Sequence, residues 1–198
     1  MKIGLIGAGR LGLCLALLMD KAGYSVIASD VREDYINDLQ IGEVTTTEPL
    51  VGQYLDSARR IEFTTDNLRV IEESDIIFTL VLTPSLENGS YDVSNVDDVV
   101  SDILKYGWDK DLSNKSLVIG CTTNPGDCDF FQDRLSETGI SVFYNPEFIA
   151  QGSIIKDLQN ADMVLLGGDG KHKGNLVNIY KKIQHGYKEP SIHLMSTK

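Results

Sequence analysis

The chain opens with Met1 and continues as KIGLIGAGRLG over residues 2–12: a short apolar strand, a glycine-rich turn and the start of a helix. In a turn of this kind Gly7 permits the sharp change of direction, Gly9 lets the backbone approach a pyrophosphate, and Gly12 lets the helix pack closely on the strand. The free N–H groups and the positive end of the helix dipole then face the phosphates. The stretch therefore predicts a dinucleotide site formed by Gly7, Ala8, Gly9, Arg10, Leu11 and Gly12.

An acidic residue stands where the ribose of such a dinucleotide is expected. Asp30 follows the apolar run Ser25–Ser29 and lies 18 positions after Gly12, where its carboxylate can accept hydrogen bonds from the ribose hydroxyls. The 2′-phosphate of NADP would meet this negative charge, which favours NAD. Arg32 is the opposing feature, because an arginine there could pair with a 2′-phosphate. We expect NAD as the cofactor.

Short apolar runs alternate with amphipathic stretches along the whole chain. The predicted strands are Lys2–Ile6, Ser25–Ser29, Ile61–Thr64, Ile76–Leu82, Ser116–Gly120, Val142–Tyr144, Met163–Leu166 and Ile192–Met195. The predicted helices are Leu11–Met19, Arg32–Ile41, Glu48–Arg60, one opened by a capping box of Ser94 and Asp97, Asp127–Glu137 and Gly174–Ile183. Unbroken apolar strands joined by helices indicate parallel crossovers. We predict an α/β fold with a doubly wound, mostly parallel, Rossmann-like sheet, forming one NAD-binding domain over residues 1–198.

Composition excludes several classes of function. The chain has 18 Lys and Arg against 29 Asp and Glu, a net charge of −11, which argues against non-specific nucleic-acid binding and against docking on anionic lipid. Cys14, Cys121 and Cys128 form no metal-binding or disulfide pattern, so no metal site is predicted. No apolar run reaches the ~18 residues that a membrane span requires. We expect a cytoplasmic protein with no nucleic-acid or membrane partner.

Further motifs follow one another in a fixed order. They are Glu48-Pro49, Val81-Leu82-Thr83-Pro84-Ser85, Cys121-Thr122-Thr123-Asn124-Pro125-Gly126, Asn145-Pro146-Glu147-Phe148-Ile149-Ala150-Gln151-Gly152, Lys156-Asp157-Leu158 and Gly167-Gly168. With the glycine turn and Asp30, this order and spacing resembles the UDP-glucose/GDP-mannose dehydrogenase family over nearly the whole chain. Members of that family oxidise the C6 alcohol of a nucleotide sugar to a carboxylate with two NAD, through an aldehyde and a thioester. The stretch Pro146-Glu147-Phe148 leans toward the UDP-glucose-like members.

The resemblance implies roles for individual residues. Beyond the glycine turn, the implied NAD contacts are Asp30, Val31, Arg32, Tyr35, Val81, Leu82, Thr83, Pro84, Cys121, Thr122 and Gln151. The implied contacts to the nucleotide sugar are Glu147, Phe148, Ile149, Ala150 and Gln151. The implied catalytic residues are Thr122 and Glu147; in the family the glutamate acts in thioester hydrolysis, where a carboxylate can order or deprotonate a water.

The sequence also departs from the family pattern. Gln151 stands where the family usually has a second glutamate, and an amide cannot take up a proton. Tyr35 replaces a basic residue, Leu50 replaces a glycine, and Cys121 replaces a serine. The family's nucleophilic cysteine and helix lysine lie beyond the matched region. Since a thiolate is needed to trap the aldehyde, we expect this polypeptide alone to bind NAD without turnover, and to dimerise only with the missing region.

The sequence leaves two other hypotheses for the function open. The β-hydroxyacid dehydrogenases share the glycine turn, although they lack the Pro-Glu-Phe stretch in this arrangement. A non-catalytic, NAD-binding regulatory module is the second alternative. Which nucleotide sugar is bound depends mostly on contacts outside this chain.

Overall fold

The central sheet has eight strands in the order β3-β2-β1-β4-β5-β6-β7-β8 in the computed structural model, which describes residues 1–149, 151–189 and 191–197. The strands are β1 (Lys2–Ile6), β2 (Ser25–Ser29), β3 (Ile61–Thr64), β4 (Ile76–Thr79), β5 (Ser116–Ile119), β6 (Ser141–Tyr144), β7 (Val164–Gly167) and β8 (Ile192–Met195). Every pairing is parallel except that of β6 with β7, which meet at Tyr144 and Gly167. The predicted doubly wound, mostly parallel α/β fold is therefore confirmed.

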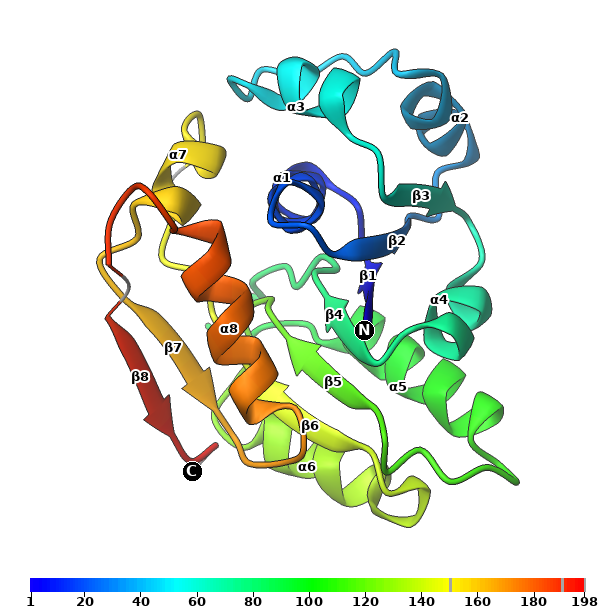
Figure 1. Ribbon diagram of the computed structural model, residues 1–198. Helices are drawn as coiled ribbons and strands as arrows, with labels where there is room; N and C mark the ends of the chain where they lie inside the picture. Colours follow the sequence, from blue (N-terminus) through cyan, green and yellow to red (C-terminus); the bar gives the residue numbers. More distant parts are fainter. Residues whose placement is uncertain (150, 190, 198) are drawn as a thin grey trace.

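Helices cover both faces of this sheet (Figure 1). One face carries α1 (Arg10–Lys21), α2 (Glu33–Ile41), α3 (Val51–Ser57), α7 (Ile154–Gln159) and α8 (Lys173–Ile183); the other carries α4 (Asn67–Glu73), α5 (Ser94–Tyr106) and α6 (Asp127–Arg134). A short 3₁₀ turn, η1 (Ser136–Thr138), follows α6. Each face has its own apolar core, which is the three-layer arrangement that buries both sides of a parallel sheet.

The buried stripes of the helices follow their sequence patterns. Every residue of α1 from Gly12 to Asp20 is buried, because this helix lies between the sheet and its neighbours α3, α7 and α8. In contrast, α5 buries one side only, through Val96, Val99, Val100 and Ile103, which recur at helical spacing. The contrast accounts for the almost continuous apolar composition of α1.

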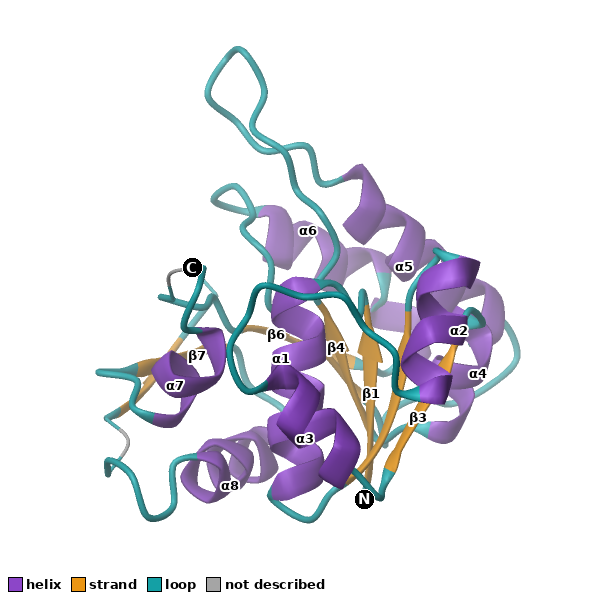
Figure 2. Ribbon diagram, turned by 90° about the horizontal axis from the view of Figure 1, so that it is seen from above, coloured by secondary structure: helices purple, strands orange, loops and turns teal. Residues whose placement is uncertain are grey.

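Two predicted strands end earlier than expected. β4 stops at Thr79 and not at Leu82, and β5 stops at Ile119. The amide of Leu80 still donates to the carbonyl of Ile6, but Gly7 then turns the backbone from β1 into α1, so the residues after Leu80 have no partner on the β1 side. The segments that carry Thr83 and Thr122 therefore project beyond the sheet as loops. The loop between β4 and α5 extends furthest (Figure 2).

Some helix predictions also need correction. The capping box at Ser94 is wrong: α5 starts at Ser94, and Asp92 accepts from the Ser94 amide at 2.9 Å, while Asp97 pairs with Arg134. The helix predicted over Glu48–Arg60 spans only Val51–Ser57. The short helices α4 and α7 were not predicted, because helices of seven and six residues carry little periodic signal.

Candidate functional site

The glycine turn after β1 has the geometry of an anion cradle. Gly7 has a φ of +98°, and a Cβ there would lie 2.7 Å from the backbone carbon of Leu80. A Cβ at Gly12 would lie 2.1 Å from the carbonyl oxygen of Gly7, whereas at Gly9 it would meet nothing within 4 Å. The amides of residues 9–12, at the N-terminus of the 12-residue α1, donate to no described residue. These donors and the helix dipole fit a diphosphate.

A cavity of about 1060 Å³ opens from this turn across the carboxyl ends of β1, β2, β4, β5 and β6. Sixteen of the residues singled out from the sequence line it: Gly7, Gly9, Arg10, Leu11, Asp30, Val31, Arg32, Tyr35, Val81, Leu82, Thr83, Cys121, Thr122, Glu147, Ile149 and Gln151. The order of strands reverses between β1 and β4, and ligands of open α/β sheets bind at such a switch point. The cavity is therefore placed and sized for a dinucleotide.

Four of the predicted site residues do not line this cavity. Ala8 and Gly12 are buried, and a Cβ at Gly12 would meet the backbone of Gly7. Pro84 and Phe148 are exposed to solvent outside the lining. Ala150, predicted as a substrate contact, lies outside the described residues.

Asp30 is held by an arginine at the end of β2. Arg32 donates to Oδ1 of Asp30 through its Nε at 2.8 Å and its backbone amide at 3.1 Å, and to Oδ2 through Nη2 at 2.9 Å. The guanidinium also lies over the ring of Tyr35, 4.2 Å from its centroid. Since a carboxylate accepts about two hydrogen bonds on each oxygen, Oδ2 keeps room for a ribose hydroxyl. Arg32 directs two of its five guanidinium N–H donors at Asp30, so a 2′-phosphate would have to compete with that carboxylate for the guanidinium.

Glu147 lies in the loop after β6, on the far side of the cavity from Asp30. The Tyr180 hydroxyl of α8 lies 2.8 Å from its Oε1, and Oε2 makes no hydrogen bond with the described residues. Burial raises the pKa of Glu147 to about 7, against the opposing effect of the Tyr180 hydrogen bond. The side chain is therefore able to hold or release a proton near neutral pH, as a general acid or base must.

Two further residues tie the Glu147 loop to the rest of the site. Glu48 is 4% exposed; its Oε1 accepts from the Gly152 amide at 2.7 Å and its Oε2 from the Ile154 amide at 3.3 Å. Arg10, in the glycine turn, donates to the side-chain oxygen of Gln151. The loop after β6 is therefore anchored by the glycine turn and by the segment that precedes α3.

The sequence of the chain also matches a known protein family. The profile described as "UDP-glucose/GDP-mannose dehydrogenase family, NAD binding domain" matches residues 1–184. The chain belongs to this family. Its cofactor is accordingly NAD, as predicted.

The relatives include enzymes for two different nucleotide sugars. A UDP-glucose 6-dehydrogenase of Rhizobium meliloti is 29% identical over 92% of this chain, and a GDP-mannose 6-dehydrogenase of Pseudomonas aeruginosa is 27% identical over 92%. A solved ternary complex of GDP-mannose dehydrogenase from Pseudomonas aeruginosa is 26% identical, with a TM-score of 0.86 over 100% of this chain. The chain spans 44% of each of the two enzymes and 47% of the solved chain.

The three cysteines of this dehydrogenase domain are buried and carry protonated thiols at neutral pH. Burial raises the pKa of Cys14 and of Cys121 to about 12, and that of Cys128 to about 11. A thiol becomes a useful nucleophile only as a thiolate. None of the three is therefore suited to trapping an aldehyde.

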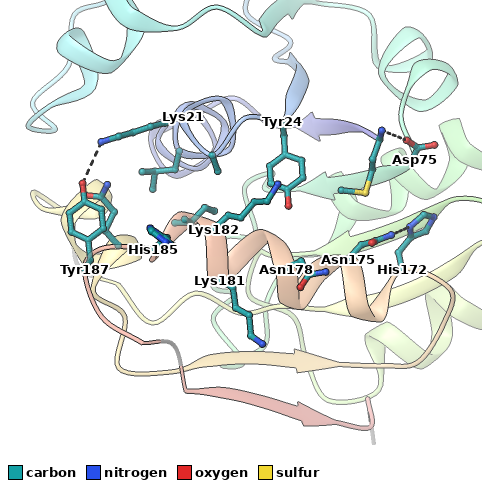
Figure 3. Close-up of a pocket in the computed structure, with 15 residues that line it drawn as sticks. Lys21, Tyr24, Asp75, His172, Asn175, Asn178, Lys181, Lys182, His185 and Tyr187 are labelled. Carbon is teal, nitrogen blue, oxygen red and sulfur yellow. Dashed lines mark hydrogen bonds and ion pairs between the residues drawn. The ribbon is translucent and has the colours of Figure 1, made fainter.

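A second hollow, of about 990 Å³, lies between α1 and α8 at the amino edge of the sheet (Figure 3). Some of its polar groups are engaged with residues outside the lining: Lys21 donates to the hydroxyl of Tyr54 at 2.7 Å, and Nε2 of His172 lies 2.7 Å from the carbonyl of Asn114. The strand ends that carry Asp30 and Glu147 lie at the opposite edge of the sheet. The cavity at the carboxyl edge is therefore the candidate cofactor site.

The described residues contain no group of three or more His, Cys, Asp or Glu side chains that is arranged to hold a metal ion. In that same part of the chain, no helix is both long enough and apolar enough to cross a membrane.

Sequence reasoning missed Tyr180, and it quoted Asn145 and Glu48 only as parts of motifs. Tyr180 is 33 positions from Glu147 and reads as one member of the apolar stripe of α8, together with Leu176, Ile179 and Ile183. A hydroxyl on an otherwise apolar stripe is the signal that was available, because a buried tyrosine needs a hydrogen-bond partner.

Proposed function

We propose that this chain is the NAD-binding part of a nucleotide-sugar 6-dehydrogenase of the UDP-glucose type. The proposed reaction oxidises the C6 alcohol of the sugar to a carboxylate through an aldehyde and a thioester. One observation carries the proposal: the glycine turn, Asp30 and Glu147 line one cavity at the switch point of the sheet, in a domain of the matching family.

The amides at the N-terminus of α1 would hold the NAD diphosphate, and Asp30 would accept from the adenosine ribose. When bound, NAD supplies the hydride acceptor for the oxidation. Thr83, Cys121 and Thr122, on the loops after β4 and β5, line the same cavity and are proposed to contact the cofactor. Val81 and Leu82 add apolar surface there.

Glu147 is the proposed base for hydrolysis of the thioester. With a pKa near 7 it takes a proton from the attacking water more readily than an ordinary carboxylate does, and its free Oε2 is available to that water. Gln151 can orient a group by hydrogen bonding but cannot share this role. Phe148, Ile149 and Gln151 are proposed sugar contacts, with Thr122 beside the reacting groups.

We place the nucleophilic cysteine and the helix lysine in the part of the relatives that this chain does not match. The protonated, buried thiols of Cys14, Cys121 and Cys128 support that placement. We further propose that residues 1–198 form one domain, that the whole protein works in the cytoplasm, and that dimerisation uses the remaining region.

Titration calorimetry with NAD and NADP, followed by NADH absorbance with NAD and UDP-glucose, tests this function. We expect tighter binding of NAD and no steady turnover by this chain alone. Preference for NADP would contradict the ribose assignment, and steady NADH formation would contradict the absence of a nucleophile. The regulatory-module alternative predicts NAD binding without turnover even in the longest natural form of the protein. Membership in the dehydrogenase family sets the β-hydroxyacid dehydrogenase alternative aside.

A further inference from the structure

The hydroxyl of Tyr180 lies between two oxygen atoms that both accept hydrogen bonds. It is hydrogen-bonded to Oδ1 of Asn145 and lies 2.8 Å from Oε1 of Glu147. Tyr180 and Asn145 are each 1% exposed, so water does not replace a missing partner easily. A tyrosine has one hydroxyl proton, and it can donate to only one of these oxygens at a time.

The orientation of the Asn145 amide is set by its other contact. Its Nδ2 donates to the carbonyl oxygen of Leu165 at 3.1 Å, and a carbonyl can only accept. The Asn145 backbone amide donates to the carbonyl of Ile119 at 2.8 Å, which holds the residue at the end of β6. Oδ1 of Asn145 must therefore face Tyr180 as an acceptor.

The protonation state of Glu147 decides whether this chain of contacts is complete. When Glu147 carries a proton on Oε1, it donates to the Tyr180 oxygen, and Tyr180 donates to Asn145, so every partner is satisfied. When that proton leaves to water in the cavity, the Tyr180 hydroxyl turns to the carboxylate and Asn145 loses its donor. Burial raises the pKa of Tyr180 well above its ordinary value, so its hydroxyl keeps its proton in both states.

We propose that Tyr180 and Asn145 are positioning residues for Glu147, forming a relay in which the Tyr180 hydroxyl keeps its proton and turns its hydrogen bond between Asn145 Oδ1 and Glu147 Oε1 as the glutamate gains and loses its own proton. Asn145 acts only through Tyr180, because Tyr180 is the group that links the two acceptors. The relay leaves Oε2 of Glu147 unengaged toward the cavity. The inference rests on the proposed function, since the relay is useful only if Glu147 exchanges a proton during the reaction.

Other charged groups near the relay do not contact Glu147 within the described residues. The charged side chains that line the cavity are Arg10, Asp30, Arg32 and Asp98. Those on the helices packed nearby are Lys156 and Asp157 of α7 and Lys173, Lys181 and Lys182 of α8. Arg10 is hydrogen-bonded to Gln151, and Arg32 to Asp30. Among the described residues, Tyr180 is the one hydrogen-bonded to the side chain of Glu147.

The relay makes a specific prediction for Asn145→Leu. This substitution removes Asn145 Oδ1, the acceptor that competes with the Glu147 carboxylate for the Tyr180 hydroxyl. Ionised Glu147 then receives the Tyr180 hydrogen bond without leaving a buried amide oxygen unsatisfied. The pKa of Glu147 should fall by about 0.5 to 1 unit, the equivalent of one neutral hydrogen bond. In a Tyr180→Phe background the same substitution should leave the pKa of Glu147 unchanged.

The pKa of Glu147 can be measured in this chain by NMR after labelling glutamate side-chain carboxyls with ¹³C, with Glu147→Gln to assign the signal. Tyr24→Phe, at the amino edge of the sheet, serves as the matched tyrosine control and should shift nothing. An equal shift from Asn145→Leu in both backgrounds, or none in either, would show that Asn145 acts by packing and would overturn the relay. Asn145→Val, an apolar residue suited to a strand end, gives the same readout if the leucine variant does not fold.

The same samples separate failure of the relay from failure of the proposed function. The glutamate titration needs no cofactor, whereas NAD binding is followed by calorimetry. A protein that binds NAD but shows no dependence of Asn145 on Tyr180 keeps its proposed function and loses the relay. A protein that shows the relay but does not bind NAD loses the proposed function, and the relay then describes only the ionisation of Glu147.

Discussion

The carboxylate of Asp30 pairs with Arg32 and also keeps an acceptor position for the proposed cofactor. It lies 9% exposed at the end of β2, and three of its hydrogen bonds come from Arg32. The pair has no net charge, so it neither repels a diphosphate nor attracts an additional phosphate on the ribose. Selectivity for NAD then depends on the remaining acceptor position of Oδ2 and on the engagement of Arg32.

Asp30→Ala should weaken NAD binding about 10-fold to 100-fold, because a hydrogen bond to a charged group contributes about 1.5–3 kcal/mol. The same substitution frees Arg32, so the affinity for NADP should rise relative to that for NAD. Titration calorimetry with both cofactors measures the two effects, and Asp34→Ala, an exposed acid on α2, is the control. Unchanged NAD affinity would remove Asp30 from the site.

The junction of β1 with α1 shows how one element serves both packing and binding. Gly12 faces the carbonyl of Gly7 inside the fold, whereas Gly9 is the N-cap of α1 and faces open space. The φ of Gly9 is −65°, which any L-residue can adopt. The two glycines are therefore required for different physical reasons, the first for close packing and the second for access to the helix N-terminus.

Gly9→Ser and Gly12→Ala should separate these two requirements. Serine is favoured at an N-cap, so Gly9→Ser should leave the melting temperature nearly unchanged while its side chain blocks the diphosphate and abolishes measurable NAD binding. Gly12→Ala forces a methyl against backbone and should lower stability by about 1–3 kcal/mol. Thermal unfolding and NAD titration of both variants provide the check, and equal losses of stability would refute the distinction.

Across the whole molecule, the site joins segments that are far apart in the chain. Glu48 anchors the loop that leads to α7 from 104 positions away, and Arg10 reaches Gln151 from 141 positions away. Glu147 is placed against α8 in a partly buried position, so its ionisation is coupled to the stability of the entire fold. Because of this coupling, the free energy of unfolding should fall as the pH rises.

Glu147 should make the folded protein less stable as the pH rises from about 4.5 to about 7. Below pH 4.5 the group is protonated in both states; between the two values only the unfolded chain ionises, because the pKa in the folded state is raised to about 7. The stability lost over this range is on the order of 3 kcal/mol, and no further loss follows above pH 7. Urea unfolding of the chain and of Glu147→Gln at pH 4.5 and pH 8 isolates this contribution, which a pH-independent difference between the two proteins would contradict.

Local pattern was sufficient for much of the fold and for one half of the site. The glycine turn, the apolar strands and the amphipathic face of α5 are each specified by residues close together in sequence, whose backbone preferences and periodicity act locally. The position of Asp30 after β2 follows from the same rule, because parallel strands end at a common edge. Short helices such as α4 and α7 escaped prediction, since their stability comes from packing and not from their own periodicity.

The other half of the site depends on tertiary structure. The contact of Glu48 with the loop before α7 and the placement of Tyr180 beside Glu147 arise only when the fold brings distant segments within hydrogen-bonding distance. Burial, which raises the pKa of Glu147, is likewise a property of the assembled layers and not of the residues beside it in the chain. Sequence determines which groups are available at the edge of the sheet, and three-dimensional packing determines which of them can exchange a proton, because desolvation and hydrogen bonding act between residues that only the fold makes neighbours.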